Sequence, residues 1–142
     1  MKGQLALCCA IAVMASAASA ELCRDIRTID GQSGETLLTL PFTGQTTTCM
    51  RSLILGGGAQ LHCGWAFSYR ADEASRAFDD LVSTVAECLG DEARITADLD
   101  VNHPDYYDLQ TFSLDGREIG VSLKDKATLS ETYVFLRITL SK

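Results

Sequence analysis

The clearest alternation of apolar and polar residues lies in residues 60–70 and predicts a β-strand with one buried face. Residues 46–55 form a second strand-like segment, and the run Gly56, Gly57 and Gly58 between the two is a strong turn signal. The two segments are therefore predicted to form a β-hairpin. Because a strand places every second side chain on the same face, the core-facing positions are Leu61, Cys63, Trp65, Phe67 and Tyr69, and the opposite positions are His62, Gly64, Ala66, Ser68 and Arg70.

A helical period replaces the alternation after residue 71. Asp72 is predicted as the N-cap, and Glu73 suits the positive end of the helix dipole. Gly90 is the kind of residue that ends a helix. The segment predicts one long amphipathic helix, with its apolar stripe formed by Ala74, Phe78, Leu81, Val82, Val85, Cys88 and Leu89, and with Asp79, Asp80, Ser83 and Glu87 on the opposite side.

Strand patterns return in the last third of the chain. Residues 105–114 and 117–123 are joined by Asp115-Gly116, a two-residue signal for a type I′ hairpin. After a turn at residues 124–130, the final strand spans 132–140, and residues 94–101 either add a strand or extend the next one. The order β-β-α-β-β-β predicts an α+β fold, in which one long helix packs on one face of an antiparallel sheet.

The amino terminus has the layout of an export signal. Lys2 precedes an apolar run at residues 5–14, and small residues stand at Ala18 and Ala20. The apolar run is shorter than the roughly 20 residues that cross a bilayer. We therefore expect residues 1–20 to be removed, leaving residues 21–142 as a single periplasmic or secreted domain without a membrane anchor. Within it, residues 21–45 are weakly patterned and predict an irregular arm with at most one short strand.

Removal of this signal changes the cysteine count from six to four, which predicts two disulfides in an oxidising compartment. Cys63 and Cys88 both face the core between helix and sheet, so they are predicted to be bonded. With the three glycines as the turn, Cys49 falls opposite Ala66 and is left to pair with Cys23. No thiol then remains for catalysis.

The net charge of the predicted mature chain bears on the kind of macromolecule that it binds. The predicted mature chain keeps 19 acidic and 11 basic residues, a formal net charge of −8. Such a charge argues against nucleic acid and anionic membranes as partners and would steer in a basic protein surface. The alternative, which accounts for the charge equally well, is that it only keeps a small exported protein soluble.

The most distinctive polar stretch spans residues 98–108. Asp98, Asp100 and Asn102 match the first three ligand positions of an EF-hand loop, but His103 and Leu109 occupy the positions that require glycine and glutamate. An irregular calcium site is left open by this partial match, and no cofactor is predicted.

The same stretch also has the composition of a recognition loop. Pro104 biases the preceding residue toward an extended conformation, and tyrosine beside polar groups is typical of protein-binding surfaces. Alternatively, the tyrosines begin a strand and the histidine is an ordinary turn residue. The predicted binding residues are His103, Asp105, Tyr106 and Tyr107, with Asp98 and Asp100 adding negative charge.

Catalytic constellations find little support. His62 and Cys63 are neighbours in a strand and point to opposite faces, so they cannot form a nucleophile–base pair. The chain has no G-x-S-x-G motif. The sequence therefore predicts a non-catalytic domain that binds another envelope or extracellular protein, for example as an inhibitor, an immunity factor or an assembly accessory. The alternative is a small secreted hydrolase that uses a carboxylate or His103.

Overall fold

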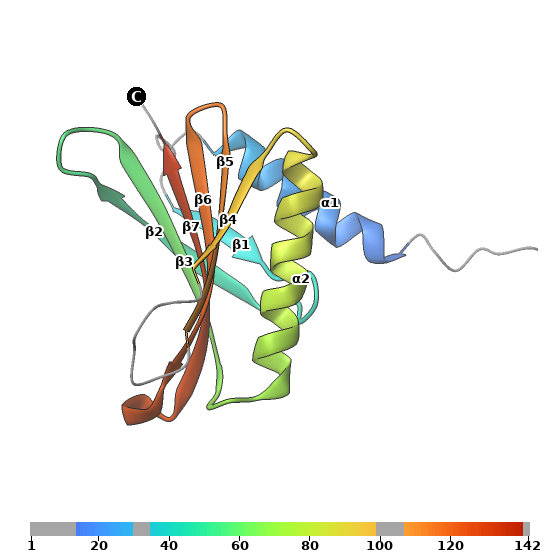
Figure 1. The fold of residues 1–142 in the computed structure, drawn as a ribbon. Helices are drawn as coiled ribbons and strands as arrows, with labels where there is room; N and C mark the ends of the chain where they lie inside the picture. Colours follow the sequence, from blue (N-terminus) through green and yellow to red (C-terminus); the bar gives the residue numbers. More distant parts are fainter. Residues whose placement is uncertain (1–13, 30–34, 99–106, 141–142) are drawn as a thin grey trace, which may run out of the picture.

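The computed structural model describes residues 14–29, 35–98 and 107–140. In this part of the chain, seven antiparallel strands form an open sheet, and two helices pack on one of its faces (Figure 1). The strand order is β1-β2-β3-β7-β6-β5-β4. The elements are α1 (Met14–Thr28), β1 (Thr36–Thr39), β2 (Thr46–Leu53), β3 (Ala59–Ser68), α2 (Asp72–Leu89), β4 (Arg94–Asp98), β5 (Tyr107–Leu114), β6 (Arg117–Lys126), a short 3₁₀ turn η1 (Ala127–Leu129) and β7 (Glu131–Leu140).

The core lies between α2 and the middle of the sheet, and it confirms the predicted α+β fold class. α2 contacts β3, β5, β6 and β7, and its buried stripe includes Phe78, Leu81 and Val85. The predicted core face of β3 is buried from Leu61 to Phe67, whereas Tyr69 lies past the end of the strand and is exposed. The core face of β7, which the period of two predicts, is also buried.

Local signals place most of the element boundaries. Asp115 and Gly116 both have positive φ, 51° and 74°, as a type I′ turn requires. The N–H of Gly90 donates to the carbonyl of Ala86 at 3.0 Å and ends α2. The predicted N-cap is displaced by one residue: Asp72 is the first residue of the helix, and Ala71 occupies the cap without a side-chain hydrogen bond.

The predicted irregular arm contains more structure than its sequence suggests. α1 continues to Thr28, and β1 pairs with β2. Leu22 and Ile26 are buried against the rest of the core, whereas the described α1 side chains ahead of Glu21 are exposed or half-buried. These two residues hold the arm to the domain, which weak patterning over so few positions did not reveal. Among the described residues, no helix is long and apolar enough to cross a membrane.

The four predicted cysteines form two disulfides, but the predicted pairing is wrong. The bonds are Cys49–Cys63 and Cys23–Cys88, with Cα atoms 4.3 and 5.3 Å apart. The first difference arises from the turn between β2 and β3. The N–H of Ile54 donates to the carbonyl of Gly58, so the loop is centred on Gly56. Met50 then pairs with His62, and Cys49 lies opposite Cys63 instead of Ala66.

The second difference arises from α1. Cys23 sits on α1, which packs beside the end of α2, and this places it next to Cys88. The bond therefore joins helix to helix and closes 65 residues of chain. Two disulfides are consistent with an oxidising extracytoplasmic compartment.

Candidate functional site

Figure 1 shows that α2 covers one face of the sheet and that β6 runs through the middle of it. The face turned away from α2 carries a shallow hollow of about 210 Å³ over β6. Its floor is made of the small residues Gly120 and Ser122. Because β6 lies between β5 and β7, longer side chains from both neighbours rise on either side. We call this hollow the β6 groove; it is lined by His62, Tyr107, Leu109, Gly120, Ser122, Lys124, Phe135 and Arg137.

Two glycines let large side chains lie flat on this face. A Cβ atom at Gly64 would come within 2.8 Å of the Phe135 ring, and one at Gly120 would lie 3.4 Å from the Arg137 guanidinium. The strand register explains both contacts, because Gly64 is opposite Phe135 and Gly120 is opposite Arg137. The lack of a side chain at Gly120 gives the groove its depth and leaves room for the guanidinium of Arg137. The lack of one at Gly64 leaves room for the ring of Phe135.

Aromatic rings form a continuous wall beside the groove. The Phe135 ring stacks on Tyr133, with centroids 5.4 Å apart, and contacts His62 on its other side at 5.0 Å. Lys124 Nζ lies 5.7 Å from the centroid of the Tyr107 ring on the β5 side. Such rings offer large apolar surfaces together with polar edges, which suits them to binding.

The groove concentrates positive charge in a predominantly acidic chain. Lys124 and Arg137 both line it, and Arg137 is paired with Glu118 at 3.0 Å. Burial lowers the pKa of His62 below its ordinary 6.5, and the nearby charge of Arg137 lowers it further. His62 is therefore neutral at pH 7. Within the described part of the chain, no carboxylate or hydroxyl hydrogen-bonds to its ring.

The structure reaches only part of the site predicted from the sequence. Tyr107 lies in the groove wall, and the backbone of Asp98 ends β4 opposite Leu109. The remaining predicted binding residues (Asp100, His103, Asp105 and Tyr106) lie outside the described residues, so the recognition loop, the irregular calcium site and a hydrolase that uses His103 all stay predictions. Among the described residues, no group of His, Cys, Asp or Glu side chains could hold a metal ion.

Sequence reasoning missed the other groove residues. The alternation in residues 132–140 places Phe135 and Arg137 on the outer face of their strand. The alternation shows which side chains share a face of this strand, but it does not show which strands lie beside it. Only the strand order shows that β3, β7, β6 and β5 lie side by side, which brings His62 and Tyr107 to the same hollow.

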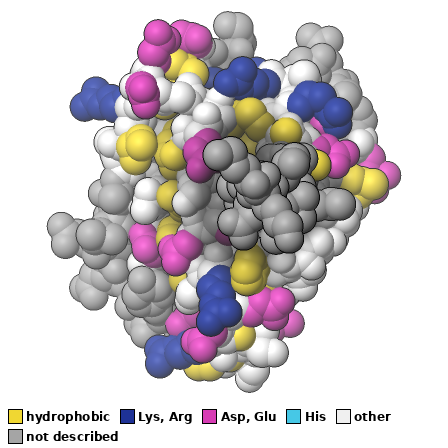
Figure 2. Space-filling view, turned by 90° about the vertical axis from the view of Figure 1, so that its right-hand side faces the viewer, with side chains coloured by type: hydrophobic (Ala, Val, Ile, Leu, Met, Phe, Trp, Pro, Cys, Tyr) yellow, Lys and Arg dark blue, Asp and Glu magenta, His cyan; other side chains and the backbone are white. Residues whose placement is uncertain are grey.

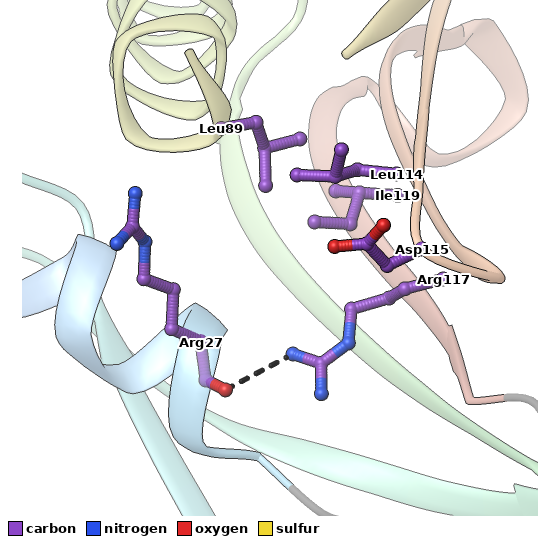
Figure 3. Close-up of a pocket in the computed structure, with 6 residues that line it drawn as sticks. All are labelled: Arg27, Leu89, Leu114, Asp115, Arg117 and Ile119. Carbon is purple, nitrogen blue, oxygen red and sulfur yellow. Dashed lines mark hydrogen bonds between the residues drawn. The ribbon is translucent and has the colours of Figure 1, made fainter. Parts of the chain in front are cut away.

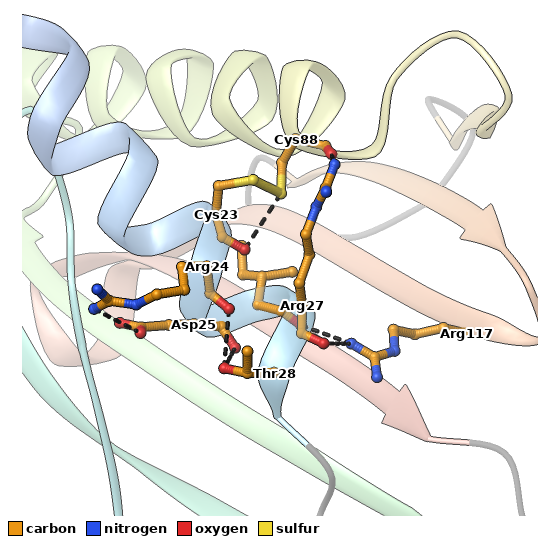
Figure 4. Close-up of a disulfide and its surroundings, with 8 residues drawn as sticks. Cys23, Arg24, Asp25, Arg27, Thr28, Cys88 and Arg117 are labelled. Carbon is orange, nitrogen blue, oxygen red and sulfur yellow. Dashed lines mark hydrogen bonds and ion pairs between the residues drawn. A yellow bond between two sulfur atoms is a disulfide. The ribbon is translucent and has the colours of Figure 1, made fainter.

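A larger cavity of about 380 Å³ lies near the ends of both helices (Figure 3). Two of its lining residues, Arg27 and Arg117, are arginines that donate hydrogen bonds to backbone carbonyls near the ends of the helices. Arg117 Nη1 donates to the carbonyl of Ile26 at 2.7 Å, and its Nη2 donates to Ile29 at 3.2 Å, which caps the end of α1. Arg27 in turn donates to the carbonyl of Cys88 at the end of α2 (Figure 4). Cations at helix C-termini stabilise them, so this cavity has a structural explanation.

A buried polar network lies at the opposite end of α2. The Asp125 carboxylate accepts from Thr132 Oγ1 at 2.7 Å and from Arg70 Nε at 3.0 Å. The backbone N–H of Arg70 donates to Thr132 Oγ1 at 2.8 Å. These bonds fasten the segment that leads into α2 to the β6–β7 hairpin, and they indicate a structural role.

Two carboxylates on the helix-covered side, those of Asp80 and Asp108, each have one buried oxygen without a hydrogen-bond partner among the described residues. Burial raises the pKa of Asp108, and the charge of Asp79 on α2 raises it further, although the backbone N–H of Leu109 opposes the shift. Burial likewise raises the pKa of Asp80, whose carboxylate accepts from the backbone N–H of Phe42. Asp80 is therefore half-buried and not on the exposed helix face that the sequence predicts.

No protein-family model, no curated protein and no solved structure matches this chain.

Proposed function

We propose that this protein is a non-catalytic domain that binds another envelope or extracellular protein through the β6 groove. One observation carries the proposal: the sheet face turned away from α2 has a hollow with a floor of Gly120 and Ser122 and with walls of aromatic and cationic side chains. Hollows in which aromatic residues and arginine combine are typical of the centres of protein interfaces.

The chemistry of the groove indicates what the partner presents there. Phe135 and Tyr107 supply apolar walls for a side chain, and Arg137, whose Nη2 pairs with Glu118 and whose buried Nε has no hydrogen-bond partner among the described residues, supplies a donor for a carboxylate. We therefore expect an extended segment with an apolar residue next to an acidic one. The helix-covered side of the molecule carries several groups of acidic side chains, with Lys and Arg side chains among them (Figure 2). A partner that is basic outside the inserted segment would complement the net charge of −8 predicted for the mature chain.

The predicted recognition loop extends this surface. Tyr107 belongs both to the loop and to the wall of the groove. In this proposal His103, Asp105 and Tyr106 add contacts beside it, with Asp98 and Asp100 supplying negative charge. If residues 1–20 act as the predicted export signal, the partner is met in the periplasm or outside the cell, and the two disulfides are consistent with such an oxidising compartment.

Site-specific photocrosslinking tests the groove directly. A photoreactive amino acid at Ser122, on the groove floor, should give one dominant crosslinked protein when the exported protein is irradiated in living cells. The matched control is the same label at Ser83, which is exposed on the far side of α2. Equal products from both positions, or none from Ser122, would contradict binding in the groove.

Filling the groove provides an independent test. Gly120→Leu adds a side chain where the three atoms nearest to a new Cβ belong to the guanidinium of Arg137, at 3.4 to 3.7 Å, so it should reduce partner capture at least tenfold without unfolding the domain. Thr139→Leu, on the same face of β7 but outside the groove lining, should leave capture unchanged. Substrate turnover that Gly120→Leu leaves intact would favour the hydrolase instead.

A further inference from the structure

β4 is an edge strand of the sheet, and among the described residues no other strand pairs with its outer side. Its register with β5 runs without interruption over all five of its residues, so it contains no bulge. Alternate N–H and C=O groups along it therefore point away from β5. Free edges bind further strands unless Lys, Pro or a bulge blocks them, and residues 94–98 contain neither Lys nor Pro.

The core-facing side of β4 is left partly open to solvent. Ile95 lies opposite Phe112 in the register, so the two residues share one face of the sheet. Phe112 is fully buried there, whereas Ile95 is 53% exposed. A single exposed apolar residue is common, but this one stands beside an unpaired strand edge. A further strand at that edge would bury it.

The residues of β4 are complementary to those of a second, antiparallel copy of the same strand. Arg94 and Asp98 stand at its two ends and carry opposite charges. When two copies pair about Thr96, Arg94 of each copy lies opposite Asp98 of the other. Ile95 of each copy then lies opposite Ala97. Opposite charges and apolar residues in such directly opposed positions stabilise an antiparallel pair.

The charges around β4 are compatible with this pairing. Arg94 is exposed and makes no ion pair with any described residue. Asp91 and Glu92 are also exposed, but they lie in the turn ahead of the strand and outside the paired segment. Salt screens charges that are more than about 8 Å apart, so at physiological ionic strength the net negative charge of each copy opposes the pairing only weakly. The two close Arg94–Asp98 contacts are screened less.

The other edge of the sheet lacks this complementarity. β1 is contacted by α1, and its residues Thr36–Thr39 carry no charge. Two copies of β1 would therefore pair without a preferred register. β4 is thus the edge that its own residues select for a second copy, and β1 provides the control positions.

We propose that the protein forms a two-fold symmetric dimer through β4, in which antiparallel pairing joins the two sheets into one. Because the two-fold axis is perpendicular to the sheet, both α2 helices lie on one face of the joined sheet and both β6 grooves open on the other. Ile95 of each copy is covered by the strand of the second copy. The dimer does not depend on what the groove binds.

Analytical ultracentrifugation of the oxidised protein, purified after export, tests the dimer. We expect a monomer–dimer equilibrium that shifts toward the dimer as the concentration rises. Arg94→Asp places like charges opposite each other and should raise the dissociation constant at least about tenfold. The charge swap Arg94→Asp/Asp98→Arg should restore the wild-type value. Arg76→Asp, an equal change of net charge at an exposed position on α2, is the matched control and should leave the dimer intact.

Hydrogen exchange locates the contact. The backbone amides of residues 94–98 should exchange more slowly as the protein concentration rises, and those of β1 should not change. Ile95→Lys should weaken the dimer, whereas Leu37→Lys, at a leucine of 59% exposure on β1, should not. Wild-type protein that stays monomeric at millimolar concentration would overturn the proposal. So would a charge swap that dimerises no better than Arg94→Asp, or equal losses from Ile95→Lys and Leu37→Lys.

Discussion

Cys49 of β2 lies directly opposite Cys63 of β3, with Cα atoms 4.3 Å apart. This spacing is typical of a non-hydrogen-bonded pair in an antiparallel ladder, where side chains approach most closely. The bond fixes the base of the β2–β3 hairpin and leaves Cys88 to bond with Cys23 on α1. One register therefore sets both disulfides, and it anchors the amino-terminal helix to the domain.

The two disulfides should differ in their contribution to stability. Cys23–Cys88 closes a 65-residue loop and Cys49–Cys63 a 14-residue loop, for which loop entropy gives about 4 and about 3 kcal/mol. We expect Cys23→Ser/Cys88→Ser to lower the free energy of unfolding in urea more than Cys49→Ser/Cys63→Ser does. Non-reducing peptide mapping is the control, and a Cys63–Cys88 or Cys23–Cys49 peptide would refute the observed pairing.

Arg117 should stabilise the end of α1. Its guanidinium donates to the carbonyls of Ile26 and Ile29, and charged hydrogen bonds contribute about 1.5 to 3 kcal/mol when buried. Because this site is partly exposed, Arg117→Met should cost about 1 to 2 kcal/mol in urea unfolding. Arg76→Met on the exposed side of α2 is the control and should change stability by less than about 0.5 kcal/mol. Equal effects would argue against the cap.

Asp125 and Thr132 should behave as one energetic unit. The Asp125 side chain is 5% exposed and accepts hydrogen bonds from both Thr132 and Arg70. Asp125→Ala removes the acceptor and leaves both donors without a partner. The free energy of unfolding should fall by about 3 kcal/mol, measured by thermal or urea unfolding. Adding Thr132→Val should cost clearly less than the sum of the two single changes. Strict additivity would show that the observed hydrogen bond does not couple the residues, and exposed Asp91→Ala is the matched control.

His62 should titrate below 6.5. Its pKa is lowered first by burial and then by the charge of Arg137, so Arg137→Gln should raise it only part of the way back. The unfolded chain therefore binds a proton more readily than the folded chain between the folded pKa and 6.5. Over that window the free energy of unfolding should fall as the pH falls, and His62→Gln should remove this contribution. NMR titration of the ring in a His103→Gln background gives the value directly; a pKa at or above 6.5 would contradict the burial argument.

The sequence by itself determined the features that depend on near neighbours. The period of two in β3 and β7 identified their buried faces, and the helical period of residues 74–89 identified α2. Asp115-Gly116 located a tight turn because its backbone requirement is local. The same reasoning gave the α+β class and four cysteines in two bonds.

Tertiary structure alone decided what depends on distant partners. Three consecutive glycines allow several turn centres, so the choice of Gly56 and the pairing of Cys49 with Cys63 were fixed only when β3 packed against β7 and α2. The position of α1 depends on a few buried contacts, such as those of Leu22 and Ile26. Two such residues are too few to form a periodic pattern in the sequence. The β6 groove likewise exists because strands far apart in sequence lie side by side, and only packing of the whole sheet sets that order.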